Sequence, residues 1–246
     1  LSNLQFVLLV AGLVGLLGCA RGQDTPPPSE TPARLIALGR YQEALKGLEG
    51  ADTPEALGWR AVAFSHLGKA PEALAQAMEA VKQAPQDPDV RLKMGMTLIL
   101  TGHYEQGVRT LDTLLRVAPN LAAAHAYKGL AFYHLGRTDS ARKACDRAIQ
   151  LEEGLADAYI WRARINIRDV DFQAAIKDAT QAITVDKSRF EAYFRRAEAY
   201  YYLNKLAEAI PDCDQAIALR PDRLDVFDLR GRCKLESGKA QEACLD

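Results

Sequence analysis

The chain has 246 residues, with 31 Lys and Arg against 32 Asp and Glu, so its formal net charge of −1 gives no basic bias of the kind that nucleic-acid binding requires. Hydrophobic residues make up 48% of the chain, which is ordinary for a globular protein and supplies enough apolar area for a sizeable core. We therefore expect a folded protein without a nucleic-acid partner.

An apolar run opens the chain. Every residue from Phe6 to Leu17 is apolar or glycine, whereas almost every residue from Arg21 to Pro32 is polar or proline. The run is shorter than the roughly 20 residues that a membrane-spanning helix needs, and it is typical of the hydrophobic region of a signal peptide. Residues 1–18 are therefore predicted to be a signal peptide that takes no part in the fold.

The run ends in the letters LLGC, Leu16 to Cys19, which resemble the bacterial lipobox. The resemblance implies cleavage after Gly18 and a diacylglyceryl group on the Cys19 sulfur, and several acyl chains hold a protein firmly on a membrane. Residues 19–33 would then be a lipidated, proline-rich tether. Ala20 stands where an aspartate would imply retention at the inner membrane, so the resemblance implies an outer-membrane protein facing the periplasm.

An ordinary cleaved signal peptide with an unmodified Cys19 is the alternative to lipidation. The chain starts LSNLQF, without the methionine and the Lys or Arg of a signal peptide, so we expect residues to be missing before Leu1.

A short helical unit follows the tether. The stretch ALGRYQEAL at 37–45 parallels HLGKAPEAL at 66–74, so that Gly39 corresponds to Gly68 at a spacing of 29. We interpret residues 34–53 as a degenerate, shortened helical repeat.

A longer spacing, with a period of 34, then governs the sequence. Its clearest register holds glycine or asparagine at most positions and predicts a turn with a permissive backbone: Gly68, Gly102, Gly136, Val170, Asn204 and Gly238. A second register holds only small residues, which allow two helices to approach closely: Ala61, Gly95, Gly129, Ala163, Ala197 and Gly231.

The segments between these marks carry apolar residues three and four apart, as amphipathic helices do. Two helices and a turn in each period, closed by sequences such as LRPDR, resemble the tetratricopeptide repeat family from Pro54 to Asp246. The resemblance implies an all-α superhelical solenoid of antiparallel helix pairs. The predicted repeats are 54–87, 88–121, 122–155, 156–189 and 190–223, followed by a partial repeat at 224–246 that lacks a polar cap and is expected to be truncated.

No constellation of residues indicates catalysis, a metal site or a cofactor, so we predict a protein that is not an enzyme. The four histidines do not have HExxH spacing, and no glycine-rich phosphate-binding motif or GxSxG motif is present. Cys145 and Cys213 share one register and are predicted to pack in the core. Cys233 and Cys244 can come within disulfide range, with two unpaired packing cysteines as the alternative.

The resemblance places a concave groove along the first helices of the repeats, and we expect a protein or peptide partner there. Candidate groove residues, read by register, are Leu92, Met96, Tyr127, Leu130, Tyr133, Trp161, Arg164, Arg168, Arg195, Tyr201 and Arg232. The same reading places Ile99, Phe194, Glu198 and Tyr202 in the groove, with pairing of Arg164 to Glu198 as an alternative role. Of the residues in the family's carboxylate clamp for chaperone tails, only Arg195 has a match.

These observations predict a lipid-anchored scaffold or adaptor of the bacterial cell envelope, with a role like that of pilotins or of adaptors for peptidoglycan hydrolases. The alternative is a non-catalytic repeat module of a larger enzyme or regulator, whose catalytic domain would lie beyond Asp246. A protein that binds glycan strands is a third reading.

Overall fold

The computed structural model describes residues 31–238 of the chain. The chain divides into two units, Leu1–Thr31 and Pro32–Asp246, and the account below concerns the second. The predicted signal peptide, the lipidation of Cys19, the tether as far as Glu30, and Cys244 lie outside the described residues.

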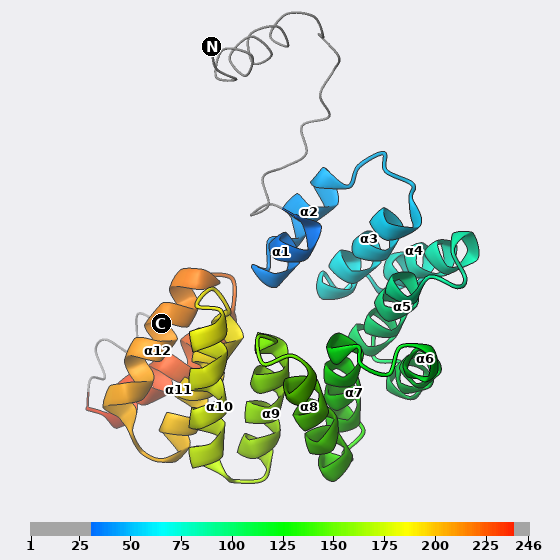
Figure 1. Cartoon of the computed structure of the whole chain (residues 1–246). Coiled ribbons are helices and arrows are strands. Elements are labelled where there is room, and N and C mark those ends of the chain that lie inside the picture. Colours follow the sequence, from blue (N-terminus) through cyan, green and yellow to red (C-terminus); the bar gives the residue numbers. More distant parts are fainter. Residues whose placement is uncertain (1–30, 239–246) are drawn as a thin grey trace, which may run out of the picture. The chain divides into compact units, whose positions relative to one another are not determined.

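The fold is all-helical over the described residues, which confirms the predicted class. The helices are α1 (Pro32–Ala37), α2 (Tyr41–Gly47), α3 (Pro54–His66), α4 (Ala70–Gln83), α5 (Pro88–Leu100), α6 (Tyr104–Val117), α7 (Ala122–His134), α8 (Thr138–Leu151), α9 (Ala156–Arg168), α10 (Phe172–Val185), α11 (Phe190–Tyr202), α12 (Leu206–Leu219) and α13 (Leu224–Glu236). From α3 onward they form pairs that follow one another around a curve (Figure 1). None of these helices is long and apolar enough to span a membrane.

The turn inside each repeat has the left-handed backbone that its residues predict. Gly68, Gly102 and Gly136 have φ of 72°, 88° and 71°, and Val170 and Asn204 adopt φ of 63° and 57° in the same register. The amide of the residue after each turn closes the helix, as in the bond from Asp171 N to the Asn166 carbonyl at 2.9 Å. The turn therefore reverses the chain in the same way in every repeat.

Small residues let the two helices of a repeat touch. A Cβ built on Gly95 would lie 2.4 Å from a methyl group of Leu111, and one built on Gly129 would lie 2.5 Å from the Cys145 sulfur. The alanines at this register, Ala61, Ala163 and Ala197, are fully buried. The core is thus a continuous row of close helix contacts along the array.

Two arginines 34 residues apart, Arg162 of α9 and Arg196 of α11, bind the second helices of their own and of the preceding repeat. Arg162 binds Asp178 with both ends of its guanidinium group, at 2.9 and 2.6 Å, and Asp146 at 2.7 Å. Arg196 binds Asp212 in the same way, at 2.7 and 2.8 Å. These bidentate pairs join the two helices of one repeat, and the bond from Arg162 to Asp146 connects that repeat to the preceding one.

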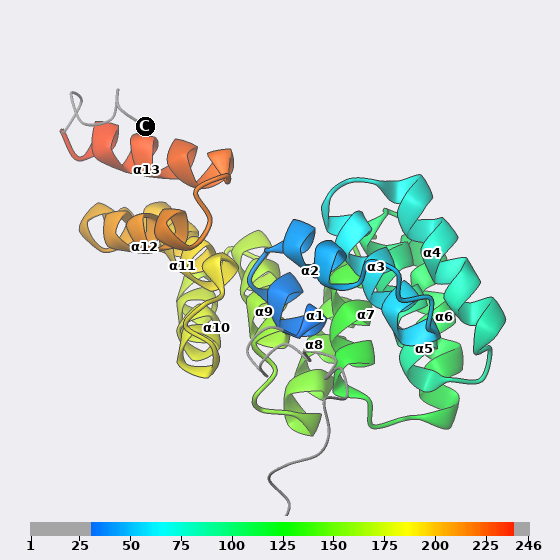
Figure 2. The ribbon, with the colours of Figure 1, turned by 90° about the horizontal axis from the view of Figure 1, so that it is seen from above.

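The short helices α1 and α2 lie on the inner side of the curve (Figure 2). Arg34 of α1 donates to Asp186 at 2.8 Å, and Arg220 donates to the Tyr41 hydroxyl at 3.5 Å. The Tyr41 ring stacks on His66 with centroids 4.7 Å apart. The N-terminal helices therefore connect residues at the two ends of the array.

Helix α1 begins at Pro32, two residues inside the segment that the sequence assigns to the tether. Proline is well placed in the first turn of a helix, because its missing N–H would have no partner there. Helix α2 has 7 residues where α4 has 14, which agrees with the spacing of 29 instead of 34.

Candidate partner-binding groove

Five predicted groove residues line a partly enclosed cavity instead of an open surface. Helix α1 covers this stretch and contributes Ala33, Ile36 and Ala37 to a cavity of about 310 Å³. The five are Leu92, Met96, Tyr127, Leu130 and Trp161. Met96 and Leu130 are each 7% exposed. Register alone could not reveal this, because the covering helix belongs to the degenerate repeat.

Charged residues form one end of this cavity. Asp157 of α9 pairs with Arg189, which precedes α11, and Arg189 Nε lies 3.9 Å from an oxygen of Glu191. Burial raises the pKa of Glu191, and burial also raises the pKa of Tyr127. The cavity therefore has a long apolar part and one charged end.

Two further residues that the sequence places in the groove belong to the core. Ile99 is 2% exposed and packs over Gly107, where a Cβ would lie 2.4 Å from it. Phe194 is 8% exposed and packs in the cluster around Cys213. Both expectations are corrected, because these side chains point between the helices of a repeat.

The second half of the predicted groove is an arginine and tyrosine surface on the first helices α7, α9, α11 and α13. We call it the arginine–tyrosine surface and define it as Tyr133, Arg164, Arg168, Arg195, Tyr201 and Arg232. Both Arg164 and Arg168 stack on the Tyr133 ring, at 4.6 and 3.6 Å from its centroid. Arg168 also donates to the Tyr133 carbonyl at 2.7 Å. Cation–π contacts therefore hold two guanidinium groups in place.

Glu198 accepts a hydrogen bond from Arg195 at 2.6 Å, whereas Arg164 stacks on tyrosine. Desolvation and the nearby charge of Arg195 lower the pKa of Arg164. At the end of the surface, Arg232 lies over Tyr201 at 5.1 Å, and the Tyr201 hydroxyl donates to Glu236 at 2.6 Å. The surface carries more arginines than carboxylates and presents aromatic rings beside them.

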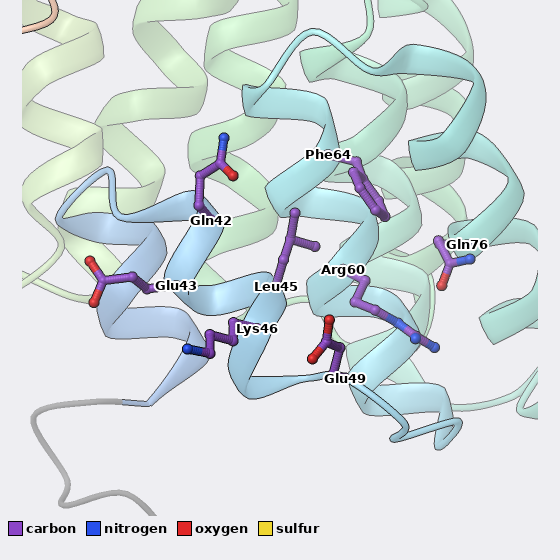
Figure 3. Close-up of a pocket in the computed structure, with 8 residues that line it drawn as sticks. All are labelled: Gln42, Glu43, Leu45, Lys46, Glu49, Arg60, Phe64 and Gln76. Atoms are coloured by element: carbon purple, nitrogen blue, oxygen red, sulfur yellow. The ribbon is translucent and has the colours of Figure 1, made fainter.

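A separate hollow of about 620 Å³ lies between α2 and the pair α3–α4 (Figure 3). Its walls carry Gln42, Leu45, Lys46 and Glu49 on one side and Arg60, Phe64 and Gln76 on the other. The hollow follows from the five residues that the first repeat lacks, because α2 ends two turns earlier than the later second helices. The shortened spacing is the sequence signal that could have indicated it.

Cys145, Cys213 and Cys233 are buried thiols. Burial raises the pKa of Cys145 to about 12, so it is unreactive at neutral pH. The Cys233 thiol contacts Cys213, and this hydrogen bond together with burial raises the pKa of Cys213. Pairing of Cys233 with Cys244 stays a prediction, because Cys244 lies outside the described residues. No group of three His, Cys, Asp or Glu side chains suited to a metal occurs within residues 31–238.

Comparison with known proteins places the chain among tetratricopeptide repeat proteins. One family model described as "Tetratricopeptide repeat" matches residues 34–88 and 92–156, and a second matches residues 190–223; together they cover more than half of the chain. Comparison with curated proteins found no match.

Solved structures agree on the fold at low sequence identity. A chain of the APC/C hetero-tetramer Cut9-Hcn1 superposes with a TM-score of 0.71 and 15% identity over 86% of this chain, which spans 44% of that chain. The protein TTC0263 of Thermus thermophilus gives 0.65 and 21% over 74% of this chain and 97% of its own. A tetratricopeptide repeat protein of Parabacteroides merdae gives 0.59 and 18%, with 87% of each chain covered.

Proposed function

Since the chain belongs to the tetratricopeptide repeat family, whose members generally act as scaffolds for protein–protein contacts, we propose that it is a membrane-anchored scaffold of the bacterial cell envelope. The lipobox-like LLGC at residues 16–19 supports lipidation of Cys19. Ala20 supports an outer-membrane location on the periplasmic side. A pilotin-like role and a role as hydrolase adaptor both fit such a scaffold.

The arginine–tyrosine surface is the observation that carries the proposed partner site. Arg168 and Arg232 are exposed, and their guanidinium groups lie over the Tyr133 and Tyr201 rings. Arginine and tyrosine dominate the energetics of many interfaces, because each offers a large contact area and a polar group. The apolar half of the curve is covered by α1, so we place the partner protein over α9, α11 and α13.

Crosslinking and affinity capture from membranes of the native host test this placement. The variant Arg168→Glu with Arg232→Glu reverses two exposed charges on the surface. Lys143→Glu with Lys177→Glu makes the same charge change on the exposed sides of α8 and α10 and serves as the matched control.

We expect a specific protein that is captured by the wild type and by the control but not by the Arg168→Glu, Arg232→Glu variant. The helical circular dichroism of this variant should equal that of the wild type. Equal capture by all three proteins would refute the partner site. Loss from the control alone would move the site to the second helices.

Fractionation tests the anchor independently. Cys19→Ser removes the sulfur that would carry the lipid, so we expect the protein to move from the membrane fraction to the soluble fraction. Retention of Cys19→Ser on membranes, with no acyl group detected on the wild type by mass spectrometry, would contradict lipidation.

A further inference from the structure

The partly enclosed cavity beneath α1 has the size and lining of a small-molecule site. Its volume of about 310 Å³ lies at the lower end of the range for ligand pockets. Apolar and aromatic side chains from six helices form most of its wall, among them Trp59, Met96, Tyr127 and Trp161. A ligand with an apolar body would remove this surface from water without any rearrangement of the array.

The charged end of the cavity has polar atoms without partners. Glu191 Oε2 and Arg189 Nε are both buried, and neither has a hydrogen-bond partner in the described part of the chain. At 3.9 Å, the two atoms are too far apart to hydrogen bond to each other. A buried carboxylate oxygen without a donor is costly and calls for a donor that the protein does not supply.

The charges at this end favour a cation. With both carboxylates ionised, Asp157 and Glu191 carry two negative charges against the single positive charge of Arg189, which leaves one negative charge in excess. Two nearby arginines already have carboxylate partners, Arg220 with Asp222 at 2.7 Å and Arg223 with Asp225 at 2.6 Å. Aromatic rings of Tyr127 and Trp161 also line the cavity, and the face of such a ring attracts a positive group.

We infer that the cavity binds a small amphiphilic amine, with the ammonium group donating to Glu191 Oε2 and an aromatic or aliphatic body packed against Trp59, Met96 and Trp161. This site is separate from the arginine–tyrosine surface and does not rest on the proposed function. An experiment that refutes partner binding at the arginine–tyrosine surface therefore leaves the amine site untouched, and the reverse also holds.

The two tryptophans of the chain, Trp59 and Trp161, both line the cavity, so intrinsic fluorescence reports directly on its occupancy. The probe is 2-phenylethylamine, titrated against the full chain at pH 7. Its neutral and anionic counterparts, 2-phenylethanol and phenylacetate, have similar apolar bodies. We expect a saturable fluorescence change with the amine and at least tenfold weaker binding of the other two. This comparison needs no variant.

Glu191→Gln keeps the shape of the side chain and removes its charge, and it should weaken amine binding at least tenfold while the binding of 2-phenylethanol stays within twofold. Glu49→Gln removes a carboxylate from the separate hollow beside α2 and is the matched control, with unchanged binding expected (Figure 3). Circular dichroism checks that both variants are folded.

Three results would overturn the inference. The amine could give no saturable signal, the three probes could bind equally well, or Glu49→Gln could lose binding while Glu191→Gln keeps it. The last result would place the amine in the other hollow.

Discussion

Val170 is the least typical residue at the turn position of the repeats. It occupies the turn register that other repeats fill with glycine or asparagine, and it adopts φ of 63° although its side chain is β-branched. The left-handed conformation costs an L-residue about 1–2 kcal/mol. The Val170 side chain is 68% exposed, so little packing compensates for this cost.

Val170→Gly should therefore stabilise the protein. Relief of the backbone strain exceeds the extra unfolded-state entropy of glycine, and we expect a net gain of about 0.5–1 kcal/mol in the free energy of unfolding. Urea denaturation followed by circular dichroism measures it. Gly136→Val, the reverse change at the same register, should lose about 1–2 kcal/mol. A stability of Val170→Gly at or below that of the wild type would show that Val170 is unstrained.

Gly95 and Leu111 form a size-matched pair. A Cβ on Gly95 would lie 2.4 Å from Leu111, whereas the equivalent residues of the preceding repeat, Ala61 and Ala77, are both alanine. Gly95→Ala alone should destabilise the protein by about 1 kcal/mol, because overpacking exceeds the gain in helix propensity.

In the background of Leu111→Ala the same substitution should be stabilising, since the space is then free. A double-mutant cycle in urea measures the coupling energy, which we expect to exceed about 0.5 kcal/mol. Additive effects of the two substitutions would contradict the size-matched pair.

At the scale of elements, an ion pair between Arg34 and Asp186 links α1 to a distant repeat. Burial acts to raise the pKa of Asp186, but hydrogen bonds from Ser188 and Arg34 outweigh it and hold this pKa below its ordinary value. The folded state therefore binds the Asp186 proton less readily than the unfolded state. The stabilisation is present at neutral pH and is lost as the pH falls through the pKa of Asp186.

Asp186→Asn should loosen α1 at pH 7. A partly exposed ion pair contributes up to about 1 kcal/mol, so we expect amide hydrogen exchange in residues 32–47 to accelerate by on the order of 2- to 5-fold. Mass spectrometry of the exchanged peptides measures this. Asp214→Asn, on another pair that joins two helices, is the control and should leave α1 unchanged. Exchange in α1 that stays at the wild-type rate would show that other contacts hold the helix.

The predictability of these elements depends on whether their contacts repeat. The turn at Gly68, Gly102 and Gly136 recurs once in every period, so the sequence predicts both the turn and its backbone. The arginine position also recurs, at Arg162 and Arg196, and this spacing was an available signal for the ion pairs. The bond from Arg34 of α1 to Asp186 joins residues 152 apart and occurs once, so the period of 34 does not predict it.

The predictability of the candidate site also depends on whether its residues stand at repeated positions. Register correctly brings Tyr133, Arg164 and Arg168 together, because each stands at a repeated position on a first helix. The partly enclosed cavity at Leu92 and Tyr127 could not be predicted, because its cover comes from outside the regular repeats. The orphaned atoms of Arg189 and Glu191 likewise depend on side-chain geometry that sequence spacing does not specify.

At the scale of the whole molecule, the array should respond locally to damage, since each repeat of a solenoid contacts its neighbours and little else. The contacts of Arg34 with Asp186 and of Tyr41 with Arg220 are exceptions, because they join distant parts of the array. Coupling between neighbouring repeats alone and additional coupling through α1 predict different responses to a destabilising substitution in the middle of the array. Leu114 of α6 suits this purpose, because its side chain is fully buried in the cluster that joins α6 to α7.

Leu114→Ala should cost about 2–5 kcal/mol through lost burial and the cavity that remains. We expect the largest acceleration of hydrogen exchange in α5, α6 and α7, and a smaller acceleration in α11 to α13 that is transmitted by the link through α1. Combining it with Asp186→Asn tests the closure, because without the link through α1 the exchange in α11 to α13 should be the same with and without Leu114→Ala. Uniform acceleration in the Leu114→Ala protein that persists after Asp186→Asn would mean that the array unfolds as one cooperative unit, without a separate role for the closure.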